Sequence, residues 1–60
     1  MKGIAIQDIQ LKRGNVIPIN TEVEIIIPNR VPEITFIRSQ KLNINFRIKT
    51  ENLQDYFKII

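Results

Sequence analysis

The chain has 60 residues, a net charge of +3, no cysteine and no histidine. One small domain spanning residues 1–60 is expected, and disulfides, the usual zinc ligand sets and the common catalytic triads are excluded. Apolar residues make up 43% and charged residues 25% of the chain, a balance that excludes a disordered composition.

The first third of the chain predicts two short strands joined by a polar loop. Isoleucine accounts for 14 of the 60 residues and alanine for one, which favours strands over helices. Within Gly3–Lys12 the apolar positions change face midway, from Ile4 and Ile6 to Ile9 and Leu11. This change of phase predicts a bulge or turn near Gln7–Asp8. After a loop tip at 12–15, the run Val16–Ile19 returns as a strand.

The middle of the chain predicts two strands separated by a loop with a proline at each end. In Glu22–Ile27 one face collects the apolar residues Val23, Ile25 and Ile27, which are predicted to point inward. The loop runs from Pro28 to Pro32, because proline cannot donate to a sheet ladder. In Glu33–Arg38, the residues predicted to point inward are Ile34 and Phe36.

The segment Lys41–Lys49 alternates apolar and polar residues without a break, which predicts a strand with one buried face. Its inward residues must share a face with those of the preceding strand. A three-residue loop, Arg38–Gln40, meets this condition by placing Phe36 opposite Leu42. The predicted core therefore includes Phe36, Ile44 and Phe46.

The tail from Thr50 onward permits two interpretations. The first is a single capped helical turn, with Thr50 accepting a backbone N–H, followed by a strand within Gln54–Ile60. The second is an amphipathic helix over Thr50–Ile60, since Leu53, Phe57 and Ile60 fit helical spacing. The β-branched end and the short length favour the turn and strand.

This order of elements resembles the Src-homology-3-like small β-barrel. The likeness lies in Pro18–Ile25, similar to the turn and strand that open its meander, and in Phe46–Leu53, similar to its exit into a helical turn. The resemblance implies an all-β fold, a small five-stranded barrel with one short helical turn before the last strand. The aromatic groove of the peptide-binding members is missing, because the first strand lacks their tyrosines and the chain has no tryptophan.

Four apolar residues are candidates for a protein-binding surface. Ile26 and Ile37 interrupt faces that are otherwise polar, so they predict a small apolar patch suited to a homodimer seam or a docking site. Tyr56 and Phe57 would point to opposite faces of a final strand, which would expose one aromatic ring. The alternatives are a curved barrel that buries both isoleucines and an open barrel end that both aromatics cover.

Seven polar residues are candidates for contact with nucleic acid. Lys12 and Arg13 lie on the predicted loop tip, and the outward face of the predicted strand over Lys41–Lys49 forms a polar and basic stripe of Lys41, Asn43, Asn45, Arg47 and Lys49. A solvated strand face and a plain polar turn are the ordinary explanations of the same residues. Nucleic acid therefore enters as the alternative partner.

The sequence predicts a small protein-binding module that is not an enzyme and needs no cofactor, metal or small-molecule substrate. The carboxylate pair Glu22 and Glu24 has no third ligand beside it and is expected to be surface charge.

The abundance of Ile, Asn and Lys indicates an AT-rich coding sequence, so a phage- or plasmid-encoded accessory or inhibitor protein is the setting considered. No apolar run is long enough for a membrane span or a secretory signal, so a cytoplasmic location is expected.

Overall fold

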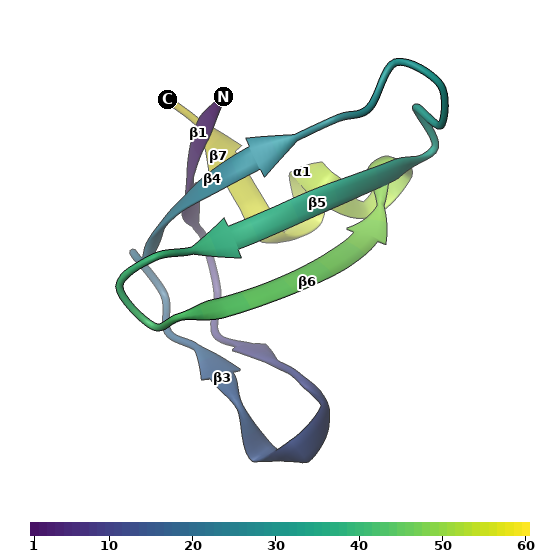
Figure 1. Ribbon diagram of the computed structural model, residues 1–60. Coiled ribbons are helices and arrows are strands. Elements are labelled where there is room, and N and C mark those ends of the chain that lie inside the picture. Colours follow the sequence, from purple (N-terminus) through teal and green to yellow (C-terminus); the bar gives the residue numbers. More distant parts are fainter.

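The computed structural model describes all 60 residues and is mostly β structure (Figure 1). A five-stranded antiparallel sheet has the order β6-β5-β4-β1-β7, and a separate two-stranded hairpin joins β2 to β3. The strands of the sheet are β1 (Lys2–Ala5), β4 (Glu22–Ile26), β5 (Ile34–Ser39), β6 (Ile44–Lys49) and β7 (Phe57–Ile59). The hairpin strands are β2 (Ile9–Gln10) and β3 (Val16–Ile17).

The architecture is consistent with the expected small barrel but does not close. β6 and β7 lie at opposite ends of the sheet order and each pairs with one strand only, so the sheet keeps two free edges. Figure 1 shows the β2–β3 hairpin projecting from one end of the curved sheet. The predicted five-stranded barrel is therefore corrected to an open five-stranded sheet with a two-stranded hairpin.

Polar contacts hold the hairpin to the rest of the molecule. The change of phase near Gln7–Asp8 is a bend, as predicted, and it separates β1 from β2. The Asp8 carboxylate accepts the backbone N–H of Ile19 at 2.7 Å across the base of the hairpin. The Gln7 side-chain amide donates to the backbone oxygen of Asp55 at 2.7 Å, which ties the same bend to the C-terminal helix.

The tail forms one helical turn and then a strand, the first of the two interpretations. A 3-10 turn (Thr50–Asn52) leads into the short helix α1 (Leu53–Tyr56), and β7 follows. β7 pairs with β1, with Gly3 opposite Ile59, so the two chain ends lie side by side (Figure 1). Thr50 does not cap the turn, contrary to the prediction, because its hydroxyl is engaged elsewhere.

A relay of hydroxyl groups links β5 to the start of this turn. The Thr50 hydroxyl donates to the backbone oxygen of Pro32 at 2.6 Å, so its own oxygen is left to accept. The Thr35 hydroxyl lies 2.7 Å away and supplies that hydrogen bond. Thr35 is fully buried, so this bond satisfies a polar group that has no access to water.

The core lies between the inner face of the sheet, the hairpin and α1. Val23 and Ile25 point inward as predicted, and Phe46 contacts Phe57 with ring centroids 6.4 Å apart. Ile44 and Phe46 are half-buried against this core, in line with their predicted place. The fully buried or nearly buried apolar residues are Ala5, Ile9, Ile17, Val23, Ile25, Ile37, Leu53 and Phe57.

The predicted phase of β5 is wrong by one residue. Thr35, Ile37 and Ser39 point inward, while Phe36 is 44% exposed on the outer face. The hairpin register pairs Phe36 with Arg47, and the loop to β6 spans residues 40–43 rather than Arg38–Gln40. Asn43 adopts a left-handed conformation with φ of 55°, and Ser39 accepts the Leu42 N–H at 3.3 Å, which together shape this longer loop.

A matched pair of lysine substitutions tests this phase. Ile37→Lys would bury an unpaired ammonium group at a position that is 1% exposed, and we expect the chain not to fold. Phe36→Lys faces solvent beside Arg47, so we expect it to fold with a loss below about 1 kcal/mol. Far-ultraviolet circular dichroism and thermal melting distinguish the two. A folded Ile37→Lys variant would contradict the structure.

The hydroxyl relay gives a second test of stability. Thr50→Val leaves the buried Thr35 hydroxyl without an acceptor and should lower the free energy of unfolding by about 1–3 kcal/mol. Thr35→Val leaves Thr50 bonded to Pro32 and should cost less, about 0.5–1.5 kcal/mol. Denaturant titration of both single variants and the double variant measures the coupling. Additive losses would mean that the two hydroxyls do not interact.

Candidate functional site

The outer face of the sheet carries an exposed apolar pair where β4, β5 and β6 lie side by side. The cross-strand register places Ile26 of β4 directly opposite Phe36 of β5, and Phe36 in turn opposite Arg47 of β6. Ile26 is 48% exposed and Phe36 44% exposed. A shallow hollow of about 430 Å³ adjoins the pair.

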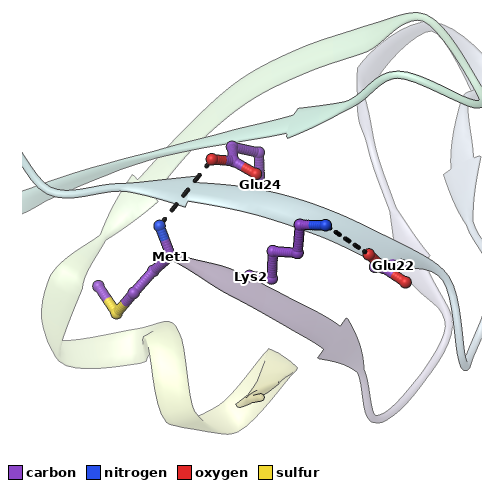
Figure 2. A network of polar contacts seen from close by, with 4 residues as sticks. All are labelled: Met1, Lys2, Glu22 and Glu24. Atoms are coloured by element: carbon purple, nitrogen blue, oxygen red, sulfur yellow. Dashed lines mark ion pairs between the residues drawn. The ribbon is translucent and has the colours of Figure 1, made fainter.

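Charged side chains surround the apolar pair unevenly. In the neighbouring row the register runs from Lys2 through Glu24 and Arg38 to Asn45. Figure 2 shows two ion pairs, between Glu24 and the amino group of Met1 and between Glu22 and the Lys2 ammonium. Their nitrogen–oxygen distances are 3.9 Å and 3.6 Å. No carboxylate lies within ion-pair distance of Arg38 or Arg47. The β5–β6 side of the face is therefore basic, and the β1–β4 side is neutralised.

The four residues predicted to bind protein are not brought together. Ile26 is exposed as expected, but Ile37 is 1% exposed, so the predicted outward placement of Ile37 is wrong and the two cannot form one surface patch. Phe57 is 2% exposed within the core, and Tyr56 is half-buried at the end of α1. The Ile37 side chain points inward because Phe36 points outward, since adjacent residues of a strand face opposite sides of the sheet.

The residues predicted to contact nucleic acid lie in three places. Lys12 and Arg13 are exposed on a 3-10 turn at the tip of the hairpin, where Arg13 has a left-handed φ of 65°. Lys41 and Asn43 lie in the β5–β6 loop, so the predicted strand over Lys41–Lys49 begins only at Ile44. The remaining three are exposed on the outer face of β6 and form a shorter stripe of Asn45, Arg47 and Lys49.

Sequence reasoning missed Phe36 and Arg38 as surface residues. Both point outward beside the basic stripe, because Phe36 pairs with Arg47 and Arg38 pairs with Asn45. Their shared parity was visible in the sequence, as was the presence of Ser39 at the opposite parity. Arg38 therefore favours an outward face for Phe36, whereas the apolarity of Ile34 and Phe36 favours an inward one.

A groove separates the hairpin from the free edge of β6. It has a volume of about 560 Å³ and is bounded on one side by Leu11 and Lys12 and on the other by β6 residues 44–48. Tyr56 closes one part of it, and its backbone oxygen accepts the N–H of Ile6 at 2.9 Å. This groove is the opening that remains because the sheet does not pair with the hairpin.

The carboxylate pair on β4 has cationic neighbours and no companion ligands. The ion pairs of Glu22 with Lys2 and of Glu24 with the amino terminus are exposed. Such exposed pairs contribute little to stability, in the range of about 0–1 kcal/mol. No group of three or more Asp, Glu, His or Cys residues is placed to hold a metal ion.

Comparisons with known proteins add no relative. No family model, no curated protein sequence and no solved structure matches the chain. None of its helices has the length and apolar character required to cross a membrane.

Proposed function

We propose that this chain is a small non-enzymatic protein-binding module that uses the outer face of β4, β5 and β6. The observation that supports the proposal is the exposed pair of Ile26 and Phe36 on that face. In a domain so short of core, an outward phenylalanine loses burial that the fold needs. A partner surface that covers the ring would recover this burial.

The surroundings of the pair support a protein partner. Protein interfaces commonly have an apolar centre with aromatic residues and arginine, enclosed by a polar rim. Here Arg47 lies directly beside Phe36, and Glu24 and Arg38 occupy the neighbouring row.

We further propose the Src-homology-3-like class of scaffold, since the strand order β7-β1-β4-β5-β6 agrees with the expected meander. A cytoplasmic, phage- or plasmid-encoded accessory or inhibitor protein remains the proposed setting.

Serine substitutions on the outer face test this proposal. Phe36→Ser and Ile26→Ser should each leave the fold intact and weaken binding to a partner or to a second copy by about tenfold or more. The matched control is Val31→Ser in the β4–β5 loop, where the side chain is 40% exposed but does not line the hollow beside Phe36. Light scattering at several concentrations measures self-association. Quantitative capture from a low-GC bacterial lysate compares retention of partners by the three variants.

The outcome that contradicts the proposal is specific. A monomeric mass at high concentration, together with partner retention that is absent or equal for Phe36→Ser and wild type, would show that the outer face binds no protein. If Phe36→Ser and Val31→Ser weaken partner binding or self-association equally, the loss of binding is a general effect of removing apolar surface. Neither result depends on the identity of the partner.

A second candidate function is binding of single-stranded nucleic acid. It is favoured by one observation, the exposed ring of Phe36 between Arg38 in its own strand and Arg47 across the ladder. Aromatic rings on a sheet face stack on bases, and arginines beside them contact phosphates. Asn45 and Lys49 extend the same face along β6.

A salt titration separates the two functions. Fluorescence anisotropy with mixed-sequence single-stranded DNA and RNA should show binding that weakens steeply with salt if phosphates are contacted. Arg47→Ala should then reduce the slope of log affinity against log salt concentration by about 1, the change expected for the loss of one phosphate contact. No binding at low ionic strength rejects this candidate and leaves the protein-binding proposal untouched.

A further inference from the structure

The free edge of β6 presents unpaired backbone groups in a regular strand. Thr50 N–H donates to Glu33 O at 2.9 Å, in register with the β5–β6 ladder. Because hydrogen-bonded and non-hydrogen-bonded pairs alternate in antiparallel ladders, the N–H and C=O groups of Ile48 and Phe46 also point toward β5. Those of Asn45 and Arg47 consequently point away from the sheet. None of the backbone hydrogen bonds outside the regular elements involves Asn45 or Arg47.

This edge carries only one of the features that usually prevent strand pairing. Proteins protect edges with short strands, proline, bulges or charged side chains. Of these, β6 has only the charged side chains of Arg47 and Lys49, which repel a basic strand and attract an acidic one. β6 has six residues with no proline, and its register with β5 is unbroken from Ile44 to Lys49. The opposite edge, β7, has three residues and ends beside the N-terminus, where Ile60 N–H donates to Lys2 O at 3.0 Å. Of the two free edges, β6 is therefore the one suited to an additional strand.

The groove beside this edge is placed to receive side chains of an added strand. Ile44, Phe46 and Ile48 point toward it from β6 and are each half-buried, as is Tyr56. A neighbouring strand would lie about 4.8 Å from β6 and would direct alternate side chains to the same face as these residues. Every second side chain of the added strand would therefore enter the groove, and the others would lie beside Arg47 on the outer face.

We propose that β6 binds an extended peptide segment of a partner protein by strand addition, and that the segment alternates apolar and acidic residues. The inference rests on the proposed protein-binding function and names its partner class. The apolar side chains fill the groove beside Phe46, and the carboxylates lie next to Arg47 and Lys49. Backbone hydrogen bonds to Asn45 and Arg47 supply the pairing, as in other cases of sheet-edge recognition.

Charge selects an acidic segment over a second copy of this chain. The charged side chains on the outer face of β6 are Arg47 and Lys49, and neither has a carboxylate within ion-pair distance. Two β6 strands paired with each other would bring their own Arg47 and Lys49 side chains together, and like charges across a ladder are destabilising. A strand with glutamate or aspartate on its outer face replaces this repulsion with attraction.

The test uses a blocked eight-residue peptide of alternating valine and glutamate, with its valine–lysine counterpart as the matched control. We expect the acidic peptide to bind and to slow hydrogen exchange at the amides of Asn45 and Arg47, measured by nuclear magnetic resonance. The lysine peptide should leave both amides unchanged. Equal binding of the two peptides, or no added protection at either amide, would overturn the proposal.

Two variants separate backbone pairing from charge. Asn45→Pro removes a free-edge N–H without removing a ladder hydrogen bond and should abolish binding of the acidic peptide, whereas Asn45→Ala should retain it. Arg47→Glu should weaken the acidic peptide by about tenfold or more and favour the lysine peptide. Because Arg47→Glu changes an exposed side chain, it keeps the charge test valid if Asn45→Pro does not fold.

Failure of this inference is distinguishable from failure of the proposed function. A peptide or partner that perturbs Phe36 and Ile26 while leaving the Asn45 and Arg47 amides unprotected would overturn strand addition and support docking on the outer face. Loss of partner binding in Asn45→Pro but not in Phe36→Ser would support the β6 edge and contradict the outer-face site.

Discussion

The orientation of β5 decides which side chains lie on the outer face of the sheet, and the hydrogen bonds of the Thr50 hydroxyl support that orientation. Thr50 is bonded to Pro32 ahead of β5 and to Thr35 within it, so the start of the strand is held from both sides. With Thr35 inward, Ile37 and Ser39 must also be inward. Ile37 lies directly opposite Phe46 in the ladder, and the Phe46 ring lies 6.4 Å from the Phe57 ring between centroids.

A partner can use two surfaces, the outer face of the sheet around Phe36 and the groove beside β6, and the orientation of β5 decides the first of them. Phe36 is outside because Thr35 and Ile37 are inside, and it places an apolar ring between Ile26 and Arg47. The inner side of β6 contributes half-buried residues to the groove because the hairpin does not pair with this strand. Arg47 takes part in both, through its side chain on the outer face and its backbone at the edge. The open sheet thus exposes two apolar areas near β6. One is the pair of Ile26 and Phe36 on the outer face, and the other is the groove beside Phe46 on the inner face.

Prediction from the sequence was accurate where apolar spacing alone decides the structure. The inward face of β4, with Val23 and Ile25, and the bend near Gln7–Asp8 follow from strand periodicity. It failed for β5, because Ile34 and Phe36 are more apolar than Thr35 and Ser39, while the hydroxyl partner of Thr35 lies 15 residues away in the chain. The exposed pair at Ile26 and Phe36 could not be found without that phase. The groove depends on the sheet remaining open, which spacing does not specify.

The ladder between β1 and β7 has a consequence for how the chain acquires its fold during synthesis. β4, β5 and β6 are consecutive and can pair through short loops soon after they leave the ribosome. Among the strands of the sheet β1 is translated first, yet one of its two neighbours, β7, is translated after all the others, since Gly3 pairs with Ile59. The sheet therefore has to remain without β7 until residues 57–59 have been translated, and contacts of such long sequence separation form slowly. During that interval the first strand of the nascent protein presents an edge that the finished molecule covers.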